Sequence, residues 1–143
     1  FAGPAGSFTT AAAMVACVER ILKLKFGRSW KGTRVAVFGA TGVVGFASSI
    51  ISALEGAHVQ LVAHRGVDRV IKSAAVSKER FGVELEPVNG ETAEQRAEVV
   101  KNAEVIFAAA AAGVQVVSKE MLKAAPNLLA IADVNAVPPA GVE

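Results

Sequence analysis

Short apolar runs alternate along this chain with longer segments of mixed or amphipathic character. Five runs have the length and the apolar or β-branched content of strands, and they lie at 33–38, 58–63, 83–87, 104–109 and 128–132. Between them, the spacing of apolar positions predicts helices at 46–54, 67–81, 91–102 and 118–125. A longer alanine-rich helix is expected at 11–24, with Thr9 or Thr10 able to cap its first turn. The pattern is that of an α/β chain.

Every connection between the predicted strands is long enough to be a crossover, which favours a parallel sheet. We therefore expect a Rossmann-type, doubly wound sheet in the strand order 3-2-1-4-5, preceded by the long helix. The third strand should lie near an edge because it contains Pro87. In this organisation residues 1–30 form a connecting segment and the long helix, and residues 31–143 form a nucleotide-binding Rossmann domain.

A glycine-containing turn links the first predicted strand to the helix after it. The turn comprises Gly39, Ala40, Thr41, Gly42, Val43, Val44 and Gly45. Glycines at such a turn let the backbone approach a pyrophosphate, whose charge is stabilised at the N-terminus of the following helix. The strand before the turn, the helix after it and the second strand beyond favour dinucleotide binding. The alternative is a tight turn between strand and helix that binds no ligand.

The residues after the second strand indicate which dinucleotide is bound. An NAD-selective site has Asp or Glu there, which accepts from the ribose 2′-hydroxyl. This chain instead has His64 and Arg65, with no carboxylate before Asp68. A guanidinium binds a 2′-phosphate through forked, charge-assisted hydrogen bonds, and Arg69 follows one helical turn later. We predict NADP rather than NAD; the alternative for Arg65 is an arginine on the solvated surface.

Two further segments follow strands that should end at the same edge of the sheet. Small side chains after the fourth strand suit a nucleotide lying against the backbone, although they also suit the start of an alanine-rich helix; they are Ala109, Ala110 and Ala111. Asp133 and Asn135 follow the fifth strand at the expected nicotinamide end, where they can orient a carboxamide or a substrate. Stabilisation of a turn before Pro138-Pro139 explains this pair equally well.

Composition narrows the class of protein. The 143 residues are enough for one core, and the hydrophobic content of 52% with a mean hydropathy of +0.44 predicts surface that contacts another domain or another protomer, as in a homo-oligomer. A net charge of +2 without a basic run argues against nucleic acid. No apolar run is long enough to span a bilayer and no signal peptide is recognisable, so a cytoplasmic protein is expected. The chain lacks an initiator methionine, which indicates a piece of something longer or a processed chain.

Few residues point to nucleophilic, acid–base or metal chemistry. Cys17 lies in the alanine-rich helical run and is expected to be a small core residue. With two histidines and no clustered cysteines, a metal site is not expected. Glu84 and Glu86 share one face of the predicted third strand, near an edge, and are expected to be solvated.

Four segments stand in the same order as in the methylene-tetrahydromethanopterin dehydrogenases, which are bacterial one-carbon enzymes. They are Gly-Ser-Phe-Thr-Thr-Ala-Ala-Ala at 6–13, the turn at 40–45, His-Arg at 64–65, and Ala-Asp-Val-Asn-Ala-Val-Pro-Pro-Ala-Gly at 132–141. Over essentially all 143 residues the chain resembles the cofactor-binding domain of this family. Ala40, Val43 and His64 depart from the residues that are usual in the family, and its amino-terminal domain is absent from this chain.

The resemblance implies NADP, or NADP together with NAD, as the hydride acceptor. It also implies that Arg65 meets the adenosine phosphate and that Thr10 faces the pterin substrate in an interdomain cleft. Hydride leaves the methylene carbon, and the cation left behind is delocalised over two pterin nitrogens. Catalysis then needs positioning rather than a general base, so no catalytic residue is assigned.

Two other functions remain open from the residues alone. One is another two-domain NADP dehydrogenase, of the methylene-tetrahydrofolate or shikimate type. The other is a nucleotide-binding module without catalytic activity.

Overall fold

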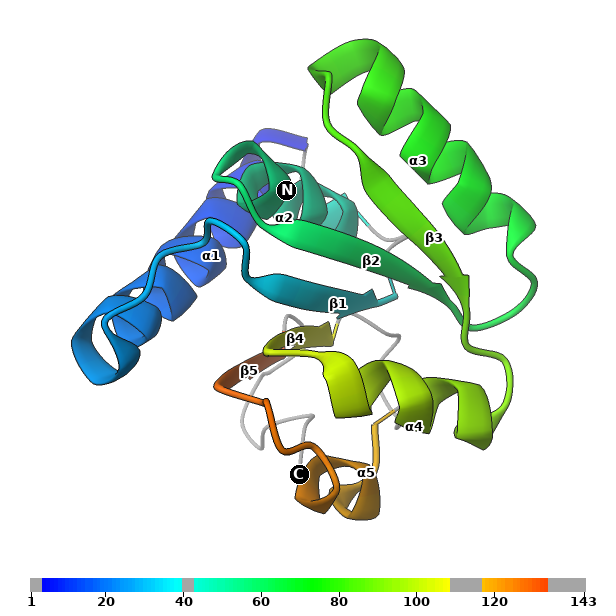
Figure 1. Cartoon of the computed structure of the whole chain (residues 1–143). Helices are drawn as coiled ribbons and strands as arrows, with labels where there is room; N and C mark the ends of the chain where they lie inside the picture. The colour runs from blue at the N-terminus through cyan, green and yellow to red at the C-terminus, as the bar shows by residue number, and fades with distance from the viewer. Residues whose placement is uncertain (1–3, 40–42, 109–116, 134–143) are drawn as a thin grey trace.

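The computed structural model of the chain describes residues 4–39, 43–108 and 117–133. Within these ranges, five parallel strands form one sheet in the order β3-β2-β1-β4-β5 (Figure 1). The strands are β1 (Arg34–Phe38), β2 (His58–Ala63), β3 (Leu85–Asn89), β4 (Val105–Ala108) and β5 (Ala130–Asp133). The predicted Rossmann-type fold, strand order and edge position of β3 are confirmed.

Helices cover both faces of this sheet (Figure 1). They are α1 (Pro4–Phe26), α2 (Val43–Leu54), α3 (Asp68–Phe81), α4 (Ala93–Asn102) and α5 (Lys119–Lys123). The first three pack into the apolar core on one face, and α4 and α5 pack into the core on the other. Strand residues alternate between the two cores, with Val35 and Val37 in one and Ala36 and Phe38 in the other. Burial on both faces explains why the central strands β1 and β4 are nearly continuous apolar runs.

The start of α1 differs from the sequence expectation. The helix begins at Pro4, well before Ala11, so Thr9 and Thr10 lie inside it. The prediction that a threonine caps the first turn was therefore wrong. Proline is well tolerated in a first helical turn because its nitrogen carries no hydrogen that needs a partner and its φ is already helical.

Other boundaries are shifted by up to three residues, and those of α2, β3, α4 and β5 are examples. Helix α2 begins at Val43 rather than at Phe46, so the last three residues of the glycine turn are helical. Strand β3 begins at Leu85 rather than at position 83, because its pairing with β2 sets Val59 opposite Leu85. Alternating residues at 83–87 suit either start, and only the pairing with the neighbouring strand decides between them.

The side of α1 that is buried follows a helical stripe that excludes Cys17. The stripe consists of Ala11, Val15, Val18 and Leu22, which recur at intervals of three or four residues. Cys17 lies off this stripe and is exposed, so the prediction of a core cysteine was wrong.

Trp30 anchors the segment between α1 and β1 to the core. Its side chain is 1% exposed, and its ring centroid lies 6.0 Å from that of Phe107 in β4. Thr33 Oγ1 donates a hydrogen bond to the carbonyl oxygen of Ser29 at 2.8 Å, which tightens the same segment. The segment is thus part of the packed domain.

Glu104 ties the amino ends of β1 and β4 together. Its carboxylate accepts from Arg28 Nη1 at 2.5 Å and from the backbone N–H of Arg34 at 2.8 Å. Burial raises the pKa of the Glu104 carboxyl, but the hydrogen bonds from Arg28 and Arg34 outweigh it and hold this pKa below its ordinary range. The hydrogen bond to Glu104 raises the pKa of Arg28 in turn.

Candidate functional site

Most of the predicted site residues follow the carboxyl ends of the strands, which lie at one edge of the sheet. Strand β1 leads into Gly39, whose φ is +81°, a backbone conformation that residues with a side chain rarely adopt. The turn therefore requires glycine at this position. Ala40, Thr41 and Gly42 lie outside the described residues.

Helix α2 begins directly after this turn. Val43 is exposed, Val44 is half-buried and Gly45 is buried. The first backbone N–H groups of a helix have no partner within it, and here they lie at the carboxyl edge of the sheet. An anion placed against the turn would meet both these donors and the positive end of the helix dipole.

Buried serines line the side of α2 behind the turn. Ser48 and Ser49 donate to the carbonyl oxygens of Val44 and Gly45, each at 2.8 Å, so their hydroxyl groups are satisfied within the helix. Helix α2 packs against α1, and small side chains allow the close approach. Sequence reasoning overlooked these serines, although small polar residues in an otherwise apolar helix were a visible signal.

Three cationic or titratable side chains follow β2 as predicted. His64, Arg65 and Arg69 are exposed, and Gly66, with a φ of +74°, turns the chain into α3. No hydrogen bond or ion pair joins any of the three side chains to another residue in the described part of the chain. They are available to an anion at this corner of the sheet.

The predicted residues after β4 and β5 are described only in part. Ala108 pairs with Asp133, so the two strands end side by side, and Asp133 is half-buried. Thr10 is exposed on α1. The other predicted members of this group lie outside the described ranges; they are Ala109, Ala110, Ala111 and Asn135.

The loop between β3 and α4 also lies at the carboxyl edge, and sequence reasoning overlooked it. The backbone N–H of Gly90 donates to the carbonyl oxygen of Ala63, the last residue of β2, at 2.9 Å. Arg96 Nη1 donates to the carbonyl oxygens of Gly90 and Glu91 at 2.9 and 3.0 Å. These contacts join the loop after β3 to the end of β2, just before His64.

A capping box starts α4 immediately after this loop. Thr92 Oγ1 accepts from the backbone N–H of Gln95 at 3.1 Å, and Gln95 Oε1 accepts from the backbone N–H of Thr92 at 3.0 Å. The Thr-x-x-Gln pattern is the signal from which this helix start could have been found.

Taken together, these residues fit a dinucleotide. Gly39 allows the backbone turn that a pyrophosphate needs, and the first turn of α2 directs N–H groups that have no partner within the helix toward it. Arg65 and Arg69 place guanidinium groups after the end of β2, and the nearest carboxylate along the chain, Asp68, lies between them at the start of α3. The arrangement can bind a phosphorylated ribose; it offers no nucleophile–base pair among the described residues.

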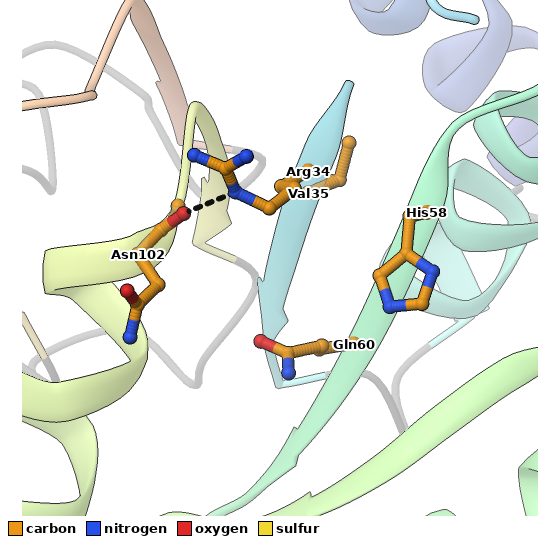
Figure 2. Close-up of a pocket in the computed structure, with 6 residues that line it drawn as sticks. Arg34, Val35, His58, Gln60 and Asn102 are labelled. Carbon is orange, nitrogen blue, oxygen red and sulfur yellow. Dashed lines mark hydrogen bonds between the residues drawn. The ribbon is translucent and has the colours of Figure 1, made fainter. Parts of the chain in front are cut away.

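A cavity of about 100 Å³ lies at the opposite, amino edge of the sheet (Figure 2). It is lined by Arg34, Val35, His58, Gln60, Asn102 and Ala103. Arg34 Nε donates to the carbonyl oxygen of Asn102 at 2.8 Å, as the dashed line in Figure 2 shows. None of the predicted site residues lines this cavity, so it is separate from the candidate site.

The two glutamates near β3 are exposed, as expected. Glu86 Oε1 lies 3.2 Å from His58 Nε2, and Glu84, which precedes the strand, lies 3.0 Å from Lys78 Nζ. Among the residues that the structure describes, no three or more His, Cys, Asp or Glu side chains are grouped so as to hold a metal ion. In the same ranges, no helix has the length and apolar character needed to cross a membrane.

Solved structures share this fold at low sequence identity. A dipicolinate synthase polypeptide from Bacillus halodurans matches with a TM-score of 0.64 at 17% identity, covering 96% of this chain and 42% of that one. Dipicolinate synthase from Bacillus subtilis gives 0.66 at 18%, covering 94% and 40%. Shikimate 5-dehydrogenase from Listeria monocytogenes, solved with shikimate and NAD, gives 0.59 at 19%, covering 84% and 43%. At these identities the matches show the fold alone.

Curated sequences give a more specific likeness, although no family model matches the chain. NAD(P)-dependent methylenetetrahydromethanopterin dehydrogenase from Methylorubrum extorquens is 50% identical over 142 residues, which cover 99% of this chain and 48% of the relative. Bifunctional protein MdtA from the same organism is 36% identical over 137 residues, covering 96% and 46%. The chain spans about half the length of the curated relatives it matches. Over that half, its resemblance to the methylenetetrahydromethanopterin dehydrogenases is confirmed.

Proposed function

We propose that this chain is the NADP-binding half of a methylene-tetrahydromethanopterin dehydrogenase. Such an enzyme is an oxidoreductase that transfers hydride from the methylene pterin to NADP⁺ and leaves the methenyl form. The observation that carries the proposal is the 50% identity, over 99% of the chain, to a relative with that name. The geometry of the carboxyl edge supports it, because donors and cations stand where a Rossmann domain holds a dinucleotide.

Each part of the edge has a role in this proposal. The turn from Gly39 to Gly45 and the first turn of α2 hold the pyrophosphate. Arg65 binds the 2′-phosphate. His64 lies beside Arg65 in the chain, and Arg69 adds positive charge. The nucleotide lies against the small residues Ala109, Ala110 and Ala111, and Asp133 and Asn135 stand at the nicotinamide end.

The chemistry asks little of the protein beyond position. When bound, the nicotinamide supplies the hydride acceptor. The chain's own residues hold the two ends of the dinucleotide, and this fixes where the acceptor carbon lies relative to the substrate. A proton does not have to be removed, so the proposed reaction needs no general base.

The substrate side of the cleft requires more than this chain. Thr10, exposed on α1, faces the pterin in this proposal, and a second domain supplies the rest of the pterin site. The protein is cytoplasmic and homo-oligomeric. Exposed apolar side chains support further contact surfaces, and they include Leu24, which is 74% exposed, Leu54, which is 59% exposed, and Phe81, which is 40% exposed.

An assay of hydride transfer tests the proposal directly. The full-length protein is incubated with methylene-tetrahydromethanopterin and NADP⁺, and the absorbance of the reduced nicotinamide is followed. A parallel reaction contains methylene-tetrahydrofolate. Reduction with the methanopterin substrate supports the proposal, whereas reduction with the folate alone points to the related two-domain dehydrogenases. If the protein binds the nucleotide but reduces it in neither reaction, the proposed activity is contradicted and the chain is a nucleotide-binding module without catalytic activity.

A further inference from the structure

Arg96 makes two hydrogen bonds that hold the loop before its own helix. The residue lies in the first turns of α4, and its Nη1 atom donates to the carbonyl oxygens of Gly90 and Glu91 at 2.9 and 3.0 Å. Hydrogen bonds from a guanidinium are stronger than those between neutral groups. The side chain therefore fixes the path of the loop that leaves β3.

The same loop is packed tightly against the end of β2. Gly90 N–H donates to the carbonyl oxygen of Ala63 at 2.9 Å. A methyl group at Gly90 would lie 2.4 Å from Val62 Cγ1, 3.0 Å from the Ala63 oxygen and 3.4 Å from Arg96 Cγ. Gly90 is thus enclosed between the last residues of β2 and the side chain of Arg96.

The cap of α4 does not require an arginine at this place. The start of α4 is already capped by Thr92 and Gln95, and a cation near the N-terminus of a helix is unfavourable to the helix dipole. In addition, Arg96 Nε is buried and has no hydrogen-bond partner among the described residues, which carries a cost. What the arginine does achieve is the pair of hydrogen bonds to the loop.

We propose that Arg96 is a positioning residue that sets the place of the His64–Arg65 turn and so the preference for a phosphorylated ribose. It acts through Gly90 on Ala63, which immediately precedes this turn in the chain. The inference rests on the proposed function, in which Arg65 binds the 2′-phosphate. The Arg65 side chain makes no hydrogen bond to a described residue, so its location depends on its backbone. Hydrogen bonds weaken steeply when distance and angle are lost, and small shifts of this turn would therefore reduce phosphate binding.

The test is a double-mutant cycle read by nucleotide binding. NADP⁺ and NAD⁺ are titrated calorimetrically into the full-length wild type, Arg65→Ala, Arg96→Met and the double variant. Arg96→Met is expected to weaken NADP⁺ binding about tenfold and NAD⁺ binding less than about twofold. In the Arg65→Ala background, Arg96→Met should no longer affect NADP⁺ binding, because the group it positions is gone.

Controls separate this role from general stability. Arg80→Met removes an exposed arginine at the far end of α3 and should leave both affinities unchanged. Circular dichroism reports the folded fraction of each variant. Should Arg96→Met fold poorly, Arg96→Lys keeps the charge but replaces the planar guanidinium by an ammonium at a different position, and the same cycle is run with it.

The outcomes distinguish the inference from the proposed function. Equal losses for the two nucleotides, or losses from the two substitutions that simply add, would show that Arg96 only supports the fold. If Arg65→Ala weakens NADP⁺ binding but the Arg96 variants keep the wild-type preference for NADP⁺ over NAD⁺, the inference about Arg96 is overturned and the proposed function stands. A wild type that binds neither nucleotide would overturn both.

Discussion

Replacement of Glu104 by glutamine tests the ion cluster at the amino edge of the sheet. Glutamine keeps the size of the side chain and an oxygen that can accept from the N–H of Arg34, but it removes the negative charge that Arg28 faces at 2.5 Å. A hydrogen bond to a charged group contributes about 1.5–3 kcal/mol. The Glu104 side chain is 10% exposed but that of Arg28 is 35% exposed, so solvent screening lowers the expected cost to about 1–2 kcal/mol. For a domain of this size, each kcal/mol of lost stability lowers the Tm by about 2–4 °C.

The pH dependence gives this prediction a sharper form. The pKa of Glu104 in the folded protein is lower than its ordinary value of 4.5, so the unfolded chain binds the proton more tightly. The stabilisation is therefore fully present above pH 4.5 and is lost as the pH falls through the lower, folded-state pKa. Urea unfolding of wild type and Glu104→Gln from neutral to acid pH measures the difference, with Glu79→Gln on the exposed surface of α3 as the control. A difference that is the same at neutral pH and in acid would refute the reasoning.

Three further substitutions test other parts of the structure. Arg65→Ala is expected to weaken NADP⁺ binding about ten- to a hundredfold and NAD⁺ binding little, because only the 2′-phosphate offers the guanidinium an anionic partner; equal losses in a calorimetric titration would contradict this contact. Gly90→Ala brings a methyl group to 2.4 Å from Val62 Cγ1 and should destabilise the protein by about 1–3 kcal/mol in urea unfolding, whereas an unchanged midpoint would mean that the loop moves away freely. Thr92→Ala removes the acceptor for the N–H of Gln95 and should lower the free energy of unfolding by about 1 kcal/mol. Thr92→Ser keeps a hydroxyl acceptor and should retain most of that stability. Equal unfolding midpoints for the two variants would show that this hydrogen bond does not stabilise the protein.

The order of the sheet could be predicted because it depends on local signals. Each buried strand appears as a short apolar run, and each crossover is long enough to be helical, so the topology follows from general rules for parallel sheets. The positions of His64 and Arg65 could also be predicted, because chain order alone places them directly after β2.

What could not be predicted depends on contacts between distant segments. Arg28 and Glu104 are separated by 76 residues, and nothing near either residue in the chain identifies the other. Arg96 resembles any charged residue of a surface helix until the loop folds back to meet it. Cys17 was misplaced because the alanine-rich helix has small residues on all sides, so the sequence hardly distinguishes its buried stripe from its exposed one.

The separation of the two edges of the sheet has a practical consequence for engineering. Strand β1 has five residues, which at a rise of about 3.3 Å per residue puts its first and last Cα atoms about 13 Å apart. This exceeds the distance of about 8 Å over which charges interact strongly at physiological salt. Charges introduced after β2 to exchange one nucleotide for another should therefore leave the Glu104 cluster undisturbed. Nucleotide specificity can therefore be changed by substitutions at the carboxyl edge, and thermal stability can be improved independently by substitutions at the amino edge.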